Sequence, residues 1–358
     1  MEKGKFLVIG GYGYVGRTIS TILANQFPGQ VIAAGRDLHK AERLSRETGG
    51  KVLPLALDIF DPETDINEAL DGVSQVIMCL DQPDTRIVEQ VIRKGVDYVD
   101  ITAANGFLTA VEKFDDLARE FGSSVVLSVG LAPGLTNLLA AQAVNALDEF
   151  ERLDIFVMLG MGDAHGNAAI LWTLENTLTE FTVLENGVPK AVRSFEDGKQ
   201  TMLPGFGKRT AYRFNFPDQH SLPKTLGIDT VSSRLCFDLE FVTKTFAALK
   251  TTGILRVLRR QWAKDVFVKL LKTLRFGTNQ FVLKVESAGR KNGDTVKIAS
   301  AIRGAGEARM TALVAAQVVR RLYVGNNPTG VFHIEQIFKL EEFIDSINEF
   351  EFSSGIEK

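Results

Sequence analysis

Near the N-terminus, glycines recur at a spacing that lets backbone amides approach a phosphate. The pattern G-x-G-x-x-G is formed by Gly11, Tyr12, Gly13, Tyr14, Val15 and Gly16. Its first glycine permits a tight turn, its second lets the backbone approach a pyrophosphate, and its third lets a helix pack on a strand. An apolar segment at 5–9 precedes the motif, and apolar residues at helical spacing follow it. The sequence therefore predicts a dinucleotide-binding turn.

Arg36 stands about twenty residues past the motif, where such folds meet the adenosine ribose. Proteins that bind NAD usually carry Asp or Glu there, which accepts a hydrogen bond from the 2′-hydroxyl. A guanidinium can instead hold a 2′-phosphate with two donors, so Arg36 favours NADP over NAD, and Lys40 would add positive charge. Asp37 leaves an alternative, because its carboxylate could bind a ribose hydroxyl or could cap the helix that follows.

Further candidates for cofactor contact follow the apolar segments of the N-terminal third. They are Asp58, Leu80, Gln82, Pro83 and Thr102. In an open parallel sheet these positions lie at the carboxyl edge, where ligands bind. Hydride transfer there also needs a proton donor or acceptor near the substrate. His165, flanked by glycines in the segment 162–166, is the leading candidate and His220 the second, whereas His39 and His333 are expected to be structural or exposed.

Composition indicates a folded protein of ordinary charge. Of 358 residues, 45% are hydrophobic and 24% charged, which argues against disorder, and the net charge of -3 gives no argument for a nucleic-acid partner. Cys79 and Cys236 are far apart and lack metal-ligand neighbours, which favours free thiols in a reducing compartment and predicts no metal site. The first expected strand leaves no room for a signal peptide, and no apolar run reaches membrane-spanning length, so a cytoplasmic location is expected.

The first 130 residues alternate between expected strands and expected helices. The strands are at 5–9, 30–35, 51–58, 73–80, 97–102 and 124–130. Such alternation predicts an α/β fold with a doubly wound parallel sheet of the Rossmann type.

The pattern changes after Asn145. Expected strands lie at 153–159, 212–216 and 231–237, with a helix at 166–181. Asn186-Gly187 and Asn292-Gly293 each separate two apolar runs, which predicts hairpins with type I′ turns. These features predict a second α+β domain with a mixed or antiparallel sheet and helices on one face.

A strongly basic helical stretch runs from Lys244 to Arg275. It holds nine Lys or Arg residues and a single acid, Asp265, with apolar residues interleaved. An amphipathic helix of this kind can make a peripheral contact with an anionic membrane surface or bind an acidic ligand. The alternative, a solvated basic face over a buried apolar one, is the more common arrangement.

Several of these segments together resemble the saccharopine dehydrogenase family. They are the glycine turn, Gly35-Arg36, Tyr98-Val99-Asp100 and, above all, Gly130-x-x-Pro133-Gly134-x-x-Asn137. The resemblance is best before residue 145 and resumes at 306–322 and 330–331. It implies an NADP-binding Rossmann domain at 1–130, a substrate and dimerisation domain at 131–305, and a C-terminal portion, 306–350, that packs back on the first domain.

The resemblance also implies roles for individual residues. Gly130 and Pro133 would contact the cofactor, and Asp100 would lie near the nicotinamide as a catalytic group. Pro133-Gly134 is expected to start a helix whose amides meet a carboxylate or carboxamide, with Gly134 and Asn137 contacting substrate. Arg213 and Arg234 could bind substrate carboxylates, although surface display is an equal alternative. The many phenylalanines of the middle domain suggest instead a larger, partly apolar substrate.

The function expected from these observations is that of an NADP-dependent oxidoreductase. It would transfer hydride to or from a C=N, C=O or C=C bond of a small-molecule substrate. Two alternatives remain: a redox-sensing regulator that binds NADP without turnover, and a membrane-associated lipid reductase. Because relatives commonly pair through the second domain and its hairpins leave an edge to cover, a homodimer is also expected.

Overall fold

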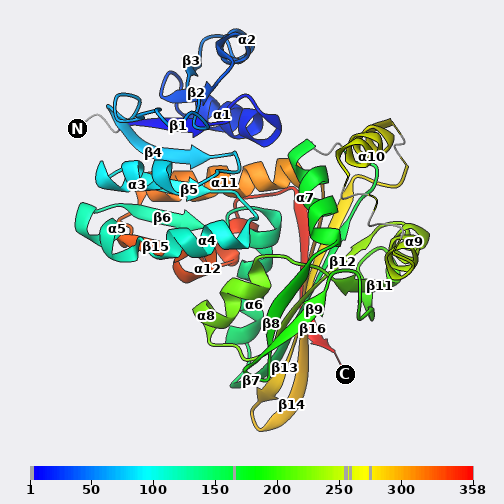
Figure 1. Cartoon of the computed structure of the whole chain (residues 1–358). Helices are drawn as coiled ribbons and strands as arrows, with labels where there is room; N and C mark the ends of the chain where they lie inside the picture. Colours follow the sequence, from blue (N-terminus) through cyan, green and yellow to red (C-terminus); the bar gives the residue numbers. More distant parts are fainter. Residues whose placement is uncertain (1–3, 164–166, 254–256, 258–259, 274–275, 358) are drawn as a thin grey trace. The chain divides into compact units, whose positions relative to one another are not determined.

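The structure, a computed structural model, describes residues 4–163, 167–253, 257, 260–273 and 276–357 (Figure 1). It consists of two compact units. The first comprises Met1–Gly134 and Ala308–Phe338, and the second comprises Leu135–Glu307 and Lys339–Lys358. The segment expected to pack back on the first domain, 306–350, therefore extends too far toward the C-terminus. The returning segment ends at Phe338, because the last strand, β16 (Phe350–Glu357), pairs with β14 (Asp294–Ala305) in the second unit.

A seven-stranded sheet forms the centre of the first unit. Its strands are β1 (Lys5–Ile9), β2 (Val31–Gly35), β3 (Val52–Ala56), β4 (Val73–Met78), β5 (Asp97–Asp100), β6 (Ser124–Leu127) and β15 (Gly330–His333). All pairs are parallel, in the order β15-β6-β5-β4-β1-β2-β3. This confirms the predicted doubly wound sheet. The strand order reverses between β1 and β4, and sheets of this kind bind ligands at the carboxyl ends of the two strands where the order reverses.

Helices pack around this sheet. They are α1 (Tyr14–Gln26), α2 (Leu38–Glu47), α3 (Arg86–Arg93), α4 (Asn105–Glu112), α5 (Asp115–Phe121), α11 (Glu307–Val324) and α12 (Ile334–Ile337). Small residues allow α11 to lie close to the strands, and Tyr323 near its end packs on Phe6 of β1 and on Phe27, with ring centroids 4.7 and 5.2 Å apart. Aromatic packing, which contributes about 0.5–1.5 kcal/mol per pair beyond area burial, therefore fixes α11 to the first strand.

The second unit contains a mixed seven-stranded sheet. Its strands are β7 (Glu149–Leu159), β10 (Lys199–Leu203), β11 (Gly207–Arg213), β12 (Val231–Phe237), β13 (Gln280–Lys291), β14 and β16. The order is β10-β11-β12-β7-β13-β14-β16, with β12 and β7 parallel and the other neighbours antiparallel. The predicted mixed sheet is confirmed. β8 (Glu180–Glu185) and β9 (Val188–Arg193) form a separate two-stranded sheet.

Both predicted Asn-Gly hairpins are present. Asn186 and Gly187 join β8 to β9 with φ angles of 53° and 73°, and Asn292 and Gly293 join β13 to β14 with φ angles of 53° and 85°. Positive φ at both central positions is the requirement of a type I′ turn. The dipeptides therefore fixed the register of both hairpins.

Helices cover one face of the mixed sheet. Ser233 on β12 donates to Asp218 of α8 (Asp218–Leu226) at 2.5 Å, and Ser300 on β14 donates to Gln142 of α6 (Thr136–Asn145) at 3.0 Å. Because side chains alternate along a strand, Arg234 next to Ser233 projects from the opposite face.

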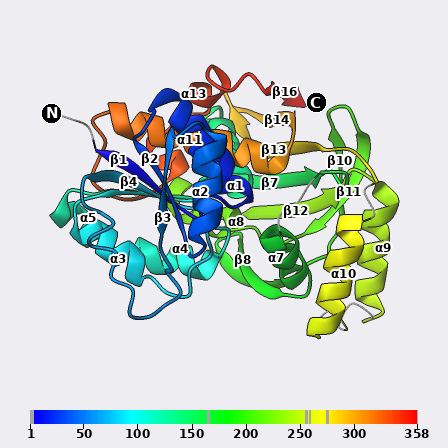
Figure 2. The same ribbon diagram turned by 90° about the horizontal axis from the view of Figure 1, so that it is seen from above.

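The basic stretch forms two helices rather than one. α9 (Glu240–Thr251) and α10 (Gln261–Thr273) share an apolar cluster with α7 (Asn167–Thr177), formed by Leu174, Phe246 and Ala263 among others (Figure 2). Acids on these and neighbouring elements pair with the cations: Lys244 with Glu240, Lys250 with Glu196 and Lys264 with Glu175. Phe241, Trp262 and Val266 nevertheless remain 60–64% exposed.

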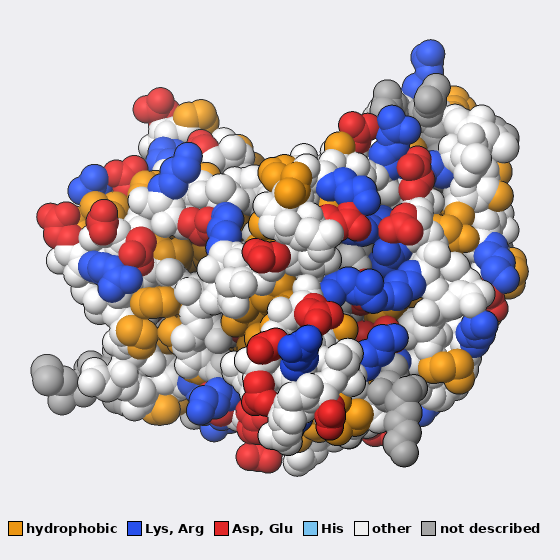
Figure 3. Space-filling model, turned by 90° about the horizontal axis from the view of Figure 1, so that it is seen from below, with side chains coloured by type: hydrophobic (Ala, Val, Ile, Leu, Met, Phe, Trp, Pro, Cys, Tyr) orange, Lys and Arg blue, Asp and Glu red, His pale blue; other side chains and the backbone are white. Residues whose placement is uncertain are grey.

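Charge is unevenly spread over the surface. On the face drawn in Figure 3, Lys and Arg side chains gather on one part of the surface, although the net charge is only -3. No helix among the described residues is long and apolar enough to span a membrane. The short α13 (Glu341–Ile344) leads into the last strand.

Candidate functional site

The glycine turn between β1 and α1 leaves no room for larger side chains. A Cβ on Gly11 would lie 2.6 Å from the Val8 carbonyl oxygen, and one on Gly16 would lie 2.2 Å from the Gly10 carbonyl oxygen. Since these neighbours are backbone atoms, only glycine lets α1 pack so closely on the turn. Gly13 is the N-cap of α1 and brings no capping side chain, and the first turn holds no acid. The start of α1 can therefore face an anion.

Tyr12 connects this turn to the end of β2. Its hydroxyl accepts a hydrogen bond from the Asp37 amide at 2.8 Å, and its ring lies where a Cβ on Gly35 would stand. The side chain thus fixes the turn from within, whereas Tyr14 is 53% exposed and Val15 half-buried beside it. Sequence reasoning assigned all three to cofactor contact and did not anticipate this bridging role.

Arg36 and Asp37 have different surroundings at the end of β2. Asp37 is the N-cap of α2, where its side chain accepts from the Lys40 amide at 3.2 Å and pairs with the Lys40 ammonium at 3.1 Å. These hydrogen bonds from Lys40 hold the pKa of Asp37 below its usual value. The helix-cap alternative is therefore correct for Asp37, and Lys40 is engaged with it. Arg36 is exposed and forms no hydrogen bond or ion pair with a described residue.

A buried polar cluster joins the ends of β4 and β5. Tyr98 donates to Asp100 at 2.5 Å, and Gln82 Nε2 donates to Tyr98 at 2.8 Å and to Asp100 at 3.3 Å. The other Asp100 oxygen accepts from the Thr102 amide at 2.7 Å, and the Thr102 hydroxyl donates to Asp81 at 2.8 Å. The predicted Asp100, Gln82 and Thr102 thus lie together. Tyr98 and Asp81 were not anticipated as members.

Burial dominates the electrostatics of this cluster. Asp100 is fully buried, and this raises its pKa to about 7, although the Tyr98 hydroxyl and the Thr102 amide both favour the carboxylate. Gln82 Oε1 is buried and has no hydrogen-bond partner among the described residues. With its nitrogen held by Tyr98 and Asp100, the amide of Gln82 offers that oxygen as an acceptor for a ligand N–H or O–H.

The remaining strand-end candidates have varied roles. Leu80 lies against Gly10, because a Cβ there would stand 2.8 Å from Leu80 Cγ. Asp58 accepts from the Phe60 amide at 3.0 Å and so caps the turn after β3. Pro83 is exposed next to Gln82. Since β1, β4, β5 and β6 are neighbours in a parallel sheet, Leu80, Gln82 and Thr102 share the edge with the glycine turn, whereas Asp58 follows the outermost strand.

The segment after β6 folds into a tight loop, not into the start of a helix. Ala132, Pro133 and Gly134 have non-helical backbone angles, the peptide before Pro133 is cis, and α6 begins only at Thr136. The expectation that Pro133-Gly134 starts the helix is wrong, because Gly134 with φ of 136° turns the chain back toward Ser128, whose carbonyl lies 3.3 Å from where its Cβ would stand.

A second buried cluster is formed around Ser128, just before this loop. Ser128 Oγ hydrogen-bonds His333 Nδ1 at 2.7 Å, and His333 Nε2 lies 3.2 Å from Glu112. Ser128 is fully buried and His333 is 4% exposed. His333 is therefore structural, as expected. No sequence signal could have joined three residues so far apart in the chain.

The remaining histidines have different placements. His165 lies outside the described residues. His220 is on α8 rather than in a loop, where its Nε2 contacts Asn215 at 2.7 Å and burial lowers its pKa to about 4. His39 is exposed on α2 and pairs with Glu42.

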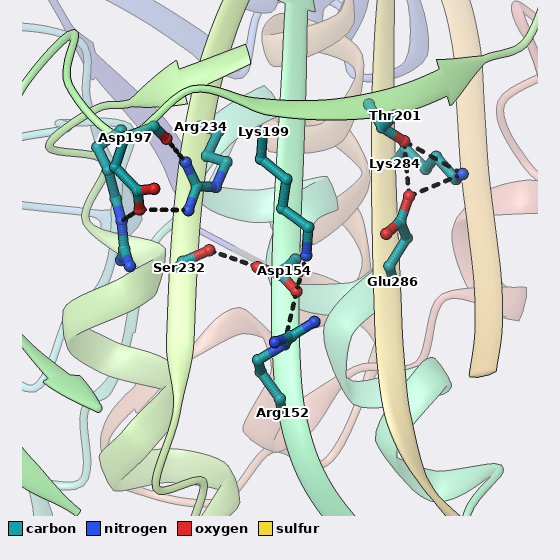
Figure 4. Close-up of polar contacts among 10 residues, drawn as sticks. Arg152, Asp154, Asp197, Lys199, Thr201, Ser232, Arg234, Lys284 and Glu286 are labelled. Carbon is teal, nitrogen blue, oxygen red and sulfur yellow. Dashed lines mark hydrogen bonds and ion pairs between the residues drawn. The ribbon is translucent and has the colours of Figure 1, made fainter. Parts of the chain in front are cut away.

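Within the second unit, the predicted substrate contacts do not come together. Asn137 on α6 is buried and donates to Ser221 of α8 at 3.3 Å, on the helix-covered face of the sheet. Arg213 and Arg234 are on the opposite face, where both pair with Asp197 (Figure 4). Asn137 and these arginines therefore lie on opposite faces of the sheet, because side chains alternate along a strand, and their roles in substrate binding stay predictions.

Comparisons with known proteins agree with this geometry. The family model for the saccharopine dehydrogenase NADP binding domain matches residues 6–127. A solved structure of apo saccharopine dehydrogenase (L-Glu forming) from Saccharomyces cerevisiae is similar, with a TM-score of 0.74 and 15% identity, covering 99% of this chain and 100% of that one. The homospermidine synthase of Legionella pneumophila, solved in complex with NAD, is similar with a TM-score of 0.66 and 11% identity, covering 98% and 91%.

The two kinds of match support different conclusions. The two solved structures are similar in fold along almost the whole chain, and the family model covers the unit that holds the glycine turn and the polar cluster. Over almost its whole length the protein therefore has the fold of these two solved structures. Residues 6–127 match the saccharopine dehydrogenase NADP binding domain, and the chain as a whole is saccharopine dehydrogenase-like in fold.

Proposed function

We propose that this protein is an NADP-dependent oxidoreductase that transfers hydride to or from a C=N, C=O or C=C bond of a small molecule. The observation that carries the proposal is the glycine cradle at the β1–α1 turn, where a Cβ on Gly11 or Gly16 would strike backbone. Such a cradle fits a pyrophosphate, and the domain family is one that binds NADP. When bound, the nicotinamide supplies or accepts the hydride.

Arg36 supports NADP rather than NAD. It is exposed at the ribose position and unpaired among the described residues, whereas the neighbouring Asp37 is occupied by Lys40. A 2′-phosphate would gain a charge-assisted pair with Arg36, worth about 1.5–3 kcal/mol. Arg36→Ala should therefore remove most of the preference for NADPH, while Arg43→Ala, an exposed arginine on α2, should keep it.

Gln82 and Asp100 are assigned complementary roles. Gln82 Oε1 would accept a hydrogen bond from an N–H of the cofactor, such as that of its carboxamide. Asp100, predicted as a catalytic group, is fully buried and holds Gln82, Tyr98 and Thr102, which supports a positioning role. Replacing it should change cofactor affinity through Gln82.

A redox-sensing regulator that binds NADP without turnover is the second candidate. It is favoured by one observation: the acid–base candidate among the described residues of the first unit, Asp100, is buried and engaged in internal hydrogen bonds. A regulator needs the cofactor site but no proton donor near the substrate.

A turnover screen separates the two functions. Purified protein with NADPH is offered imino acids, ketones and enones, and oxidation is followed by the absorbance of the reduced nicotinamide. The oxidoreductase predicts turnover with at least one class, lost in a Gly16→Ala variant. Tight NADPH binding with no oxidation across the panel would reject the enzyme in favour of the regulator.

A further inference from the structure

Arg213 and Arg234 stand side by side on neighbouring strands with one carboxylate between them. They face each other in the register of β11 and β12, and both side chains are less than a tenth exposed. Asp197 accepts from Arg213 Nε at 2.9 Å and from Arg234 Nη2 at 2.7 Å, and its backbone oxygen accepts from Arg234 Nη1. Two buried guanidinium groups therefore share a single anion.

The same ratio of two cations to one carboxylate recurs on the adjacent strand, β7 (Figure 4). Asp154 of β7, 7% exposed, pairs with Arg152 at 2.9 Å and with Lys199 at 2.6 Å, and Ser232 donates to its other oxygen at 2.7 Å. Each of the two carboxylates thus serves two cations. Positive charge in excess at a buried position is costly unless an anion compensates it.

Several N–H donors of Arg213 and Arg234 also have no acceptor among the described residues. Arg234 Nε is buried and has no hydrogen-bond partner among the described residues. Arg213 bonds described residues only through Nε, so its two terminal amino groups make no hydrogen bond there. A guanidinium offers a planar fork of donors that suits a carboxylate or a phosphate.

Asp197 approaches the pair from the solvent side. Its side chain is 61% exposed, and its φ of 51°, with 57° at Phe195, places it on a tight turn. Partial burial would raise the pKa of Asp197, but hydrogen bonds from Arg234 and Arg213 outweigh this and lower it to about 2. The Asp197 carboxylate thus lies on the solvent side of the two guanidinium groups. An external oxyanion would bind beside it there.

We propose that Arg213 and Arg234, with Arg152 and Lys199 beside them, form a binding site for a small oxyanion that carries a phosphate or carboxylate group. The site is on the sheet face opposite α8 and Asn137. Its residues all belong to the second unit, whereas the glycine cradle is in the first, so the proposal does not depend on the proposed oxidoreductase function.

Calorimetric titration with inorganic phosphate and with succinate, at constant ionic strength set by chloride, tests the site. Arg213→Gln should weaken binding at least about fivefold, because the free fork is lost. Arg193→Gln, an exposed arginine paired with Glu180 on the two-stranded sheet, is the matched control and should bind like the parent. Phosphate-only binding assigns a phosphate ligand, and succinate-only binding assigns a carboxylate ligand.

Asp197→Asn provides the opposite change. Removing the resident carboxylate should tighten anion binding about threefold or more and make the melting temperature rise further with added anion than in the parent. Binding of neither probe to the parent, or equal affinity in the parent and Arg213→Gln, would overturn the proposal. NADPH affinity measured in parallel should not change in Arg213→Gln, so failure of this site and failure of the cofactor assignment are distinguishable.

Discussion

At the scale of single residues, the burial of Asp100 has a direct consequence for the pH dependence of stability. Its pKa is about 7 in the folded protein against an ordinary 3.8, and desolvation is the main cause. A carboxyl whose pKa is raised on folding stabilises the fold in its protonated form. That contribution is complete below about pH 4 and is lost as the pH rises through 7.

Asp100→Asn should therefore flatten the pH dependence of stability. The uncharged amide resembles the protonated acid, so the variant should lose less free energy of unfolding than the parent between about pH 5 and 8, by on the order of a few kcal/mol. Urea denaturation at both pH values measures this. A slope remains from Asp97, whose pKa burial raises to about 6. An Asn variant with the parent's full slope would contradict the burial argument.

Some residue roles were accessible from sequence and others were not. Asp37 as a helix cap follows from its position just before a helical pattern, and the glycines follow from their spacing. The Tyr12–Asp37 and Ser128–His333 contacts join residues distant in the chain, and no local pattern encodes them. The family resemblance pointed to Asp100, but it gave no indication that this side chain is completely buried.

At the scale of elements, the close packing of α1 on the glycine turn can be tested directly. A Cβ in Gly16→Ala would stand 2.2 Å from the Gly10 carbonyl, so the turn must shift and both stability and NADPH affinity should fall. We expect a loss of about 1–3 kcal/mol in unfolding free energy and at least about tenfold in NADPH affinity. Denaturation and NADPH fluorescence titration measure these.

Gly106→Ala is the matched control for this change. Gly106 lies in α4 with nothing within 4 Å of its Cβ position. Alanine there should leave NADPH affinity unchanged and stability equal or slightly higher. If Gly16→Ala behaved like this control, the turn would not be the cradle described above.

The exposed apolar residues of α10 carry the prediction of peripheral membrane contact. Trp262 and Val266 are one helical turn apart and each is 60% exposed, in a stretch rich in cations. This pattern suits a helix that rests on an anionic bilayer. Vesicles containing phosphatidylglycerol should co-sediment the protein, and the double change Trp262→Ser with Val266→Ser should lower the bound fraction several-fold. Equal sedimentation of parent and variant, or equal binding to phosphatidylcholine vesicles, would argue against the contact.

Elements were predictable where the signal is local. The N-terminal strands and helices have clear periodicity, and the Asn-Gly pairs define both hairpins. β10 and β16 were missed, because each is short or polar and is stabilised by pairing with a strand rather than by its own pattern. The sequence predicts the basic stretch as one helical unit, whereas the structure has two helices. The acids that pair with Lys250 and Lys264 lie outside the stretch, so its own sequence does not reveal them.

At the scale of the whole molecule, the mixed sheet of the second unit ends in the edge strand β16. Among the residues that the structure describes, β16 pairs only with β14, and Ile356 on it is 61% exposed. Edge strands of this kind are commonly covered by a partner. The proposed homodimer through the second unit predicts a light-scattering mass near twice 39.3 kDa, and Ile356→Lys should lower the dimer fraction if this edge takes part. A mass near 39.3 kDa at micromolar concentration would contradict the dimer.

The chain divides into a unit with the glycine turn and a unit with the mixed sheet, and the first unit is proposed to bind NADP as a redox cofactor. Isothermal titration of the unmutated protein with NADPH and then NADH, in one buffer, tests this most directly. We expect one NADPH per chain and an affinity at least about tenfold higher than for NADH. Equal affinities for the two cofactors, or no binding of either, would contradict it.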